Sequence, residues 1–126
     1  MPLLRRSLSV LSLGSLTLLS ACGCNLVGCF DGLTVALSVA PVGGYRVEAR
    51  VLGSPAAFVF ECPADQDCGA RAFFADFTPE VAFITVITSR GTVQREVRPR
   101  YTLQQPNGKG CEPRCMQGTV TVESPA

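Results

Sequence analysis

Apolar and polar residues alternate in short runs along the chain from residue 32 onward. The clearest run spans 45–51, whose odd-numbered residues are apolar or aromatic and whose even-numbered residues are charged. Because successive side chains of a strand point to opposite faces, this period of two predicts a strand with one buried face. The same pattern predicts further strands at 32–39, 57–62, 70–77 and 119–122.

Two Phe-rich runs carry specific expectations about which side chains are buried. In the run 57–62, alternation places three residues on one face: Phe58, Phe60 and Cys62. In the run 70–77, it places three on one side: Phe73, Ala75 and Phe77.

Two later runs depart from simple alternation. The run 81–88 is almost continuously apolar or β-branched, which is typical of a central strand covered on both faces or nearly so. The run 93–103 alternates over its whole length but contains Pro99, which cannot donate a ladder hydrogen bond. We therefore expect one long strand there, at a sheet edge or with a bulge. Gly91 predicts a hairpin turn at 89–92.

The spacing of these runs predicts the fold class. Pro- and Gly-rich segments separate the strands, and no segment after the N-terminal region has a convincing helical period. We expect an all-β domain, an antiparallel β-sandwich of seven or eight strands, of immunoglobulin-like or transthyretin-like kind. The Cys-Trp-Cys spacing of true immunoglobulin domains is absent, so only the architecture is predicted.

The N-terminal region has the layout of a secretory signal. Arg5 and Arg6 precede an uncharged run, 7–21, that ends in small residues. The run is shorter than the roughly 20 apolar residues of a membrane span and contains several hydroxyl side chains. We therefore expect a signal helix that is cleaved off. The Arg pair also raises a twin-arginine signal, which the flanking residues fit poorly.

The end of this run, Leu19-Ser20-Ala21-Cys22, resembles a bacterial lipobox. The resemblance implies cleavage before Cys22 and a diacylglycerol on its sulfur, with Gly23 favouring the outer membrane over inner-membrane retention. It divides the chain into a signal peptide at 1–21, a Gly/Cys-rich tether at 22–31 and a β-sandwich domain at 32–126. The alternative is an ordinary secretory signal, with Cys22 in a disulfide.

All seven cysteines lie at residue 22 or later, which is typical of an exported chain. If Cys22 is lipidated, an even set of disulfide candidates remains: Cys24, Cys29, Cys62, Cys68, Cys111 and Cys115. Six cysteines allow 15 pairings, which sequence alone does not separate. Closeness along the chain favours Cys62–Cys68, Cys111–Cys115 and Cys24–Cys29. The main rival joins the segment 24–29 to the loop 111–115.

Composition lowers the expectation of an enzyme or a nucleic-acid-binding protein. The chain has no His, which excludes Ser-His-Asp and Cys-His catalysis and removes the commonest general base. Cleavage before Cys22 would leave nine basic and ten acidic residues of the eleven and ten in the full chain, with no basic run. We expect no enzyme activity, no cofactor and no nucleic-acid partner.

Several groups of side chains are candidates for a metal-binding, acid/base or interaction site. Cysteine thiolates could bind zinc or copper, but their spacing and export favour disulfides, so no metal site is predicted. Asp65 and Asp67 lack the further oxygen ligands of a calcium loop. Nothing in the sequence brings the other carboxylates together as an acid/base pair: Glu48, Glu61, Asp76 and Glu80. A candidate interaction face, for acidic headgroups or a polyanion, consists of Arg95, Arg98 and Arg100.

The mature region resembles the small, poorly characterised β-sandwich lipoproteins of Gram-negative envelopes, with Gly44-Tyr45-Arg46-Val47-Glu48 as a short strand-opening motif. The sequence therefore predicts a lipid-anchored structural or protein-interaction domain of the cell envelope. We expect it on the outer membrane, facing the periplasm or the cell surface, with an envelope protein as its partner. The alternative is a small-ligand carrier or accessory subunit, whose pocket would be lined by Phe58, Phe60, Phe73, Phe74 and Phe77.

Overall fold

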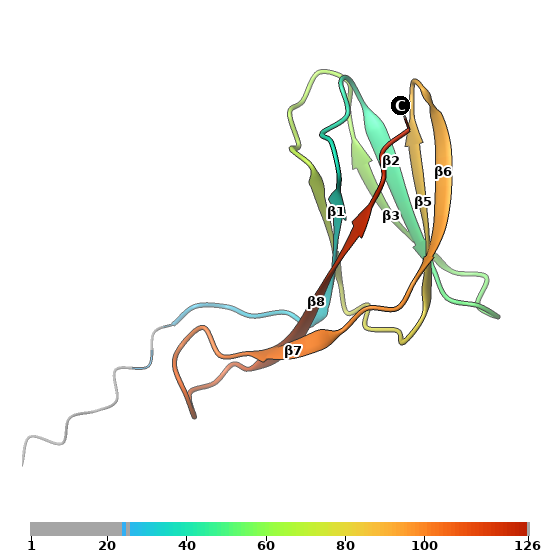
Figure 1. The fold of residues 1–126 in the computed structure, drawn as a ribbon. Helices are drawn as coiled ribbons and strands as arrows, with labels where there is room; N and C mark the ends of the chain where they lie inside the picture. The colour runs from blue at the N-terminus through green and yellow to red at the C-terminus, as the bar shows by residue number, and fades with distance from the viewer. Residues whose placement is uncertain (1–23, 25, 126) are drawn as a thin grey trace, which may run out of the picture.

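The computed structural model describes residues 24 and 26–125 and is built from eight β-strands with no helix in this part (Figure 1). The strands are β1 (Gly32–Leu37), β2 (Tyr45–Arg50), β3 (Ala57–Cys62), β4 (Arg71–Ala75), β5 (Ala82–Thr88), β6 (Gly91–Val97), β7 (Tyr101–Gln104) and β8 (Cys115–Val122). They form two four-stranded sheets, in the orders β4-β1-β8-β7 and β3-β2-β5-β6. The predicted all-β sandwich is confirmed. The predicted signal helix lies outside the described residues.

The sandwich has two ends, here named proximal and distal. β1 and β8 pair in parallel, and all other strand pairs are antiparallel. The proximal end, where the chain enters β1, holds residues 24 and 26–31 and the β7–β8 loop, 105–114. The distal end holds the β1–β2 connection, 38–44, the β5–β6 turn, 89–90, and the C-terminal residues 123–125 (Figure 1).

The core lies between the inward faces of the two sheets. β1 contributes Leu33 and Val35, and the opposite sheet contributes Val47 and Ile84, all fully buried. Burial of each such side chain contributes about 1.5–3 kcal/mol. The alternation predicted for β1 and β2 is confirmed within the strands, whereas Val39 and Val51, at the ends of the predicted runs, lie beyond them and are exposed. β5 is central, between β2 and β6, as predicted, and its outward face is half-buried.

The predicted burial of the Phe-rich strand β4 is wrong by one residue. Ala72 and Phe74 point into the core, while Phe73 and Ala75 are exposed. Phe77 is buried as expected. The two buried Phe residues are three positions apart because Asp76 has a φ of 56°, which breaks the period of two after the strand ends. Phe73 instead covers Gly32, where an added Cβ would collide with its ring.

The single long strand predicted over 93–103 is also wrong. The segment forms two strands, β6 and β7, that belong to different sheets, and Pro99 lies in the crossing between them. The strand breaks at Pro99 because proline has no backbone N–H to donate to a β-ladder, as anticipated from the sequence. Both strands are sheet edges, and the hairpin turn predicted before β6 is present between Thr88 and Gly91.

Candidate functional site

Two long-range disulfides fasten the N-terminal segment to the β7–β8 loop at the proximal end. Cys24 is bonded to Cys111 and Cys29 to Cys115, with Cα–Cα distances of 5.7 and 5.8 Å. The favoured local pairings Cys24–Cys29 and Cys111–Cys115 are therefore wrong, and the long-bridge alternative is correct. Neither partner could be chosen from sequence distance, because the bridged residues lie 87 and 86 positions apart. Cys22 lies outside the described residues.

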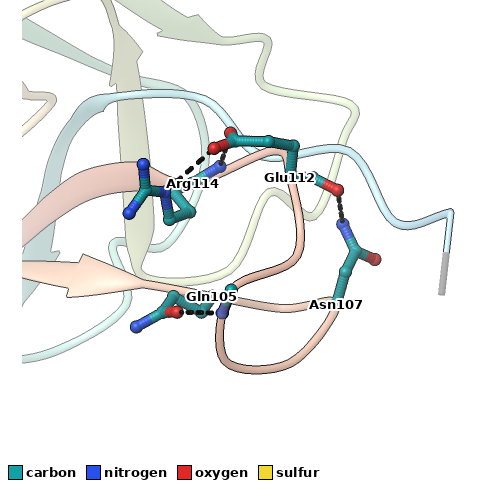
Figure 2. A network of polar contacts seen from close by, with 5 residues as sticks. Gln105, Asn107, Glu112 and Arg114 are labelled. Carbon is teal, nitrogen blue, oxygen red and sulfur yellow. Dashed lines mark hydrogen bonds and ion pairs between the residues drawn. The ribbon is translucent and has the colours of Figure 1, made fainter. Parts of the chain in front are cut away.

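Asn107 joins the same two segments by hydrogen bonds. Its Oδ1 accepts from the Val27 backbone N–H at 2.7 Å, and its Nδ2 donates to the Val27 carbonyl at 2.9 Å. Nδ2 also donates to the Glu112 carbonyl at 3.1 Å (Figure 2). The amide thus pairs with both polar groups of one residue, as a neighbouring strand would. Asn107 is buried, so these bonds satisfy groups that water does not reach.

The rest of the proximal loop is held by local contacts. Gln105 Oε1 accepts from the Gly110 N–H at 3.1 Å, and Glu112 forms an ion pair with Arg114 at 3.0 Å (Figure 2). Asp31 Oδ1 accepts from the Met116 N–H at 2.7 Å, at the start of β8. The described part of the predicted tether is therefore fixed along the domain. The sequence showed Asn107-Gly108 only as a loop, because nothing local reveals a partner eighty residues away.

A shallow, mainly apolar cavity of about 280 Å³ lies at the distal end. Its walls come from the β1–β2 connection, the β5–β6 turn and the C-terminal residues, among them Val39, Val42, Arg90 and Pro125. Ser124 Oγ donates to the Val39 carbonyl at 2.6 Å and holds two of these walls together. Val39 and Val42 are 67% and 85% exposed. The sequence pattern predicted a strand that includes Val39 and turns at Val42 and Arg90, and it gave no sign of a cavity between them.

The third disulfide, Cys62–Cys68, closes a short loop beside this end, as predicted. Asp67 Oδ1 accepts from the Gly69 N–H at 3.0 Å, so this carboxylate stabilises the loop. Tyr45 donates its hydroxyl to the Gly69 carbonyl at 3.0 Å. Burial, and secondarily the negative charge of Asp67, raises the pKa of Tyr45. The two carboxylates of this loop, Asp65 and Asp67, belong to no group of three or more potential metal ligands within the described residues.

The three arginines of the candidate interaction face are spread over different surroundings. Arg95 pairs with Glu123 at 3.2 Å and links edge strand β6 to the end of the opposite sheet. Arg98 pairs with Glu96 at 3.2 Å, and Arg100 is exposed beside Pro99 in the crossing between the sheets. Exposed pairs of this kind contribute about 0–1 kcal/mol. Carboxylates thus partly neutralise this face, which argues against a strong polyanion site.

The five phenylalanines of the predicted ligand pocket do not line a common cavity, and Phe58 and Phe73 are 40% and 41% exposed. Phe74 and Phe77 are buried in the core, and Phe58 contacts Phe77 with ring centroids 4.8 Å apart. The ring of Phe60 packs against that of Tyr45, with ring centroids 5.9 Å apart. The distal cavity is lined by none of these phenylalanines. The packing therefore gives no support to a Phe-lined carrier pocket.

Comparison of the chain with protein families, with curated proteins and with solved structures finds no significant match. Across residues 24 and 26–125, no helix is long and apolar enough to cross a membrane. The function must therefore be inferred from this chain's own residues and contacts.

Proposed function

We propose that the protein is a lipid-anchored envelope lipoprotein whose β-sandwich is a non-enzymatic interaction domain. The lipobox-like sequence Leu19-Ser20-Ala21-Cys22 carries the proposal, since it provides both the cut and the thiol for a diacylglycerol. Two acyl chains bind a bilayer far more persistently than one, because each buried methylene contributes about 0.8 kcal/mol. The three disulfides agree with an oxidising compartment outside the cytoplasm.

Cys24, two residues after the proposed anchor in sequence, is bonded at the proximal end, opposite the distal cavity. β1 and β8 run side by side from the proximal end to the distal end (Figure 1). A chain anchored through Cys22 would therefore present Val39, Val42 and Arg90 away from the bilayer. We assign to this end the binding of an envelope protein, through its apolar walls and the positive charge of Arg90.

The anchor is tested by the intact mass of protein extracted from its native membrane, wild type beside Cys22→Ser. The wild type is expected to begin at Cys22, to carry the mass of acyl chains and to contain three disulfides. An unlipidated wild type with an ordinary signal-peptide cut would contradict the proposal.

The interaction role is tested by a photo-crosslinking residue placed at position 42 in living cells. A discrete protein adduct is expected there, and none from a matched probe at Gln94, which is exposed on the outward face of β6, farther from the distal end. Equal adduct patterns at both positions would contradict a distal binding surface.

A further inference from the structure

We propose that the proximal end of the domain docks on the bilayer that carries the anchor, with Leu26 and Phe30 inserted into its headgroup region. This inference rests on the proposed lipidation of Cys22. It goes beyond it because the β-sandwich itself, and not only the acyl chains, would contact the membrane.

The length of chain between anchor and disulfide limits how far the domain can stand from the bilayer. Only Gly23 separates Cys22 from Cys24, so their Cα atoms can be at most about 7 Å apart. Cys24 is bonded to Cys111, 5.7 Å away between Cα atoms, in the β7–β8 loop. The Cα atom of Cys111 in this loop is therefore kept within about 13 Å of that of the lipidated residue. One leaflet's headgroup region is itself about 5–8 Å thick, so this loop stays at the membrane surface.

The segment that follows the anchor exposes large apolar side chains. Leu26 is fully exposed, Phe30 is 65% exposed and Val27 is 50% exposed. Leu103 and Met116 are register partners on β7 and β8 and are 49% and 40% exposed. An apolar concentration of this kind marks an interaction surface. The short link to the anchor identifies the bilayer as its occupant.

The backbone contacts keep this apolar segment in place. Asn107 pairs with both polar groups of Val27, and Gln117 Nε2 donates to the Phe30 carbonyl at 2.9 Å. Cys29, between them, is bonded to Cys115. The side chains of Leu26 and Phe30 are thus carried on a segment that is already ordered, which reduces the entropy lost on docking.

Charge contributes little to this contact. The proximal end carries Asp31, Lys109, Glu112 and Arg114, two acidic and two basic residues. Glu112 and Arg114 neutralise each other as an ion pair. Docking should therefore depend on apolar insertion and change little with salt concentration or with the fraction of anionic lipid.

The chain contains no Trp, so a single introduced Trp reports its own surroundings. The full-length protein is produced in its lipidating host as Leu26→Trp and as the matched control Val42→Trp, which is 85% exposed at the distal end. Each is reconstituted into vesicles of phosphatidylethanolamine and phosphatidylglycerol that contain acyl-brominated lipid. Phe30→Trp serves as a second reporter, and intact mass verifies lipidation and three disulfides in every sample.

The expected result is a blue-shifted emission and about twofold or greater quenching for Leu26→Trp, as for a side chain about 5–10 Å into the headgroup–acyl boundary. Phe30→Trp should behave likewise, and Val42→Trp should stay unquenched. If lipidated Leu26→Trp and Phe30→Trp match Val42→Trp, the docking is wrong while the anchor stands. If Cys22 carries no lipid, the proposed function is wrong and the docking falls with it.

Discussion

The two ends of this sandwich are closed in different ways. At the proximal end, two disulfides and the buried amide of Asn107 fasten segments that lie eighty or more residues apart. At the distal end, the β1–β2 connection and the C-terminal residues meet through Ser124, around an apolar cavity. Cross-linking is thus concentrated where the proposed anchor would pull on the domain. At the end that would face a partner, the joined segments are equally far apart in sequence, but they are held by hydrogen bonds in place of disulfides.

The largest expected effect comes from removing both proximal bridges. In the chain-entropy model, the first bridge closes a ring of about 87 residues and contributes about 4–5 kcal/mol, and the second closes a small remaining ring worth about 3 kcal/mol. Replacing Cys24, Cys29, Cys111 and Cys115 by Ala should therefore cost about 7 kcal/mol of unfolding free energy. Urea denaturation of the variants measures this loss.

The two proximal bridges should also be strongly non-additive. Removing either pair alone should cost only about 3 kcal/mol, because the other pair still closes the long ring. Removing Cys62–Cys68 at the distal end should cost about 2 kcal/mol and add independently to either. Simple additivity of the two proximal pairs would mean that they do not act on the same ring.

The next effect tests the hydrogen bonds of Asn107. Asn107→Ala leaves the Val27 N–H and two carbonyls without this partner and should lower the unfolding free energy by about 1–3 kcal/mol. The control Gln94→Ala, on the exposed face of β6, should change it by less than about 0.5 kcal/mol. Chemical denaturation with all disulfides intact distinguishes the two. Equal losses would show that Asn107 does not hold the proximal end.

Alkaline pH should weaken both ends through one tyrosine each, Tyr45, which is buried, and Tyr101, which is half-buried. Burial raises the pKa values of Tyr45 and Tyr101 above the ordinary 10.0 of tyrosine. The Tyr101 hydroxyl donates a hydrogen bond to the Pro79 carbonyl at 2.7 Å. The unfolded chain then loses these protons at lower pH than the folded one. The stabilisation is complete below pH about 10 and is lost as pH rises through the folded pKa values.

The unfolding free energy of the wild type should therefore be lower at pH about 10.5 than at pH about 8. In the double variant Tyr45→Phe/Tyr101→Phe, the decrease between these two pH values should be smaller. Asp67→Asn should reduce the Tyr45 contribution alone, because its charge contributes to that shift. An unchanged pH slope in the double variant would assign the alkaline loss to other groups.

The smallest expected effect is at the distal cavity. Val42→Ala should change the unfolding free energy by less than about 0.5 kcal/mol, because this side chain is 85% exposed. The buried counterpart Val35→Ala should cost more than about 1 kcal/mol. A large loss in Val42→Ala would mean that the distal wall is part of the core and is not available to a partner.

Local patterns predicted most of the strands, and contacts between distant residues account for the errors. Alternation located β1, β2 and β3 because a period of two is a property of adjacent residues. It could not show that the chain changes sheets at Pro99, since both parts keep the same alternation. The positive φ of Asp76, which places Phe77 on the buried side with Phe74 and not with Phe73, is likewise set by the path of the chain after β4.

The candidate site was less predictable from sequence than the fold. The partners of Cys111, Cys115 and Asn107 are brought to them by the parallel pairing of β1 with β8, which no local motif encodes. The lipobox-like segment ending at Cys22, in contrast, could be found from sequence alone. Its proposed recognition by a signal peptidase would depend only on adjacent residues in an extended chain. It lies outside the described residues and stays a prediction.

The most direct test of the proximal clamp is a non-reducing tryptic peptide map of the membrane-extracted protein. Cleavage after Arg46, Lys109 and Arg114 separates the three parts that the clamp joins: peptides 22–46, 110–114 and 115–126. We expect one disulfide-linked species that contains all three peptides and the acyl chains on Cys22, and that separates on reduction. Recovery of 22–46 free of the other two, with 110–114 linked only to 115–126, would show local pairing and contradict the clamp.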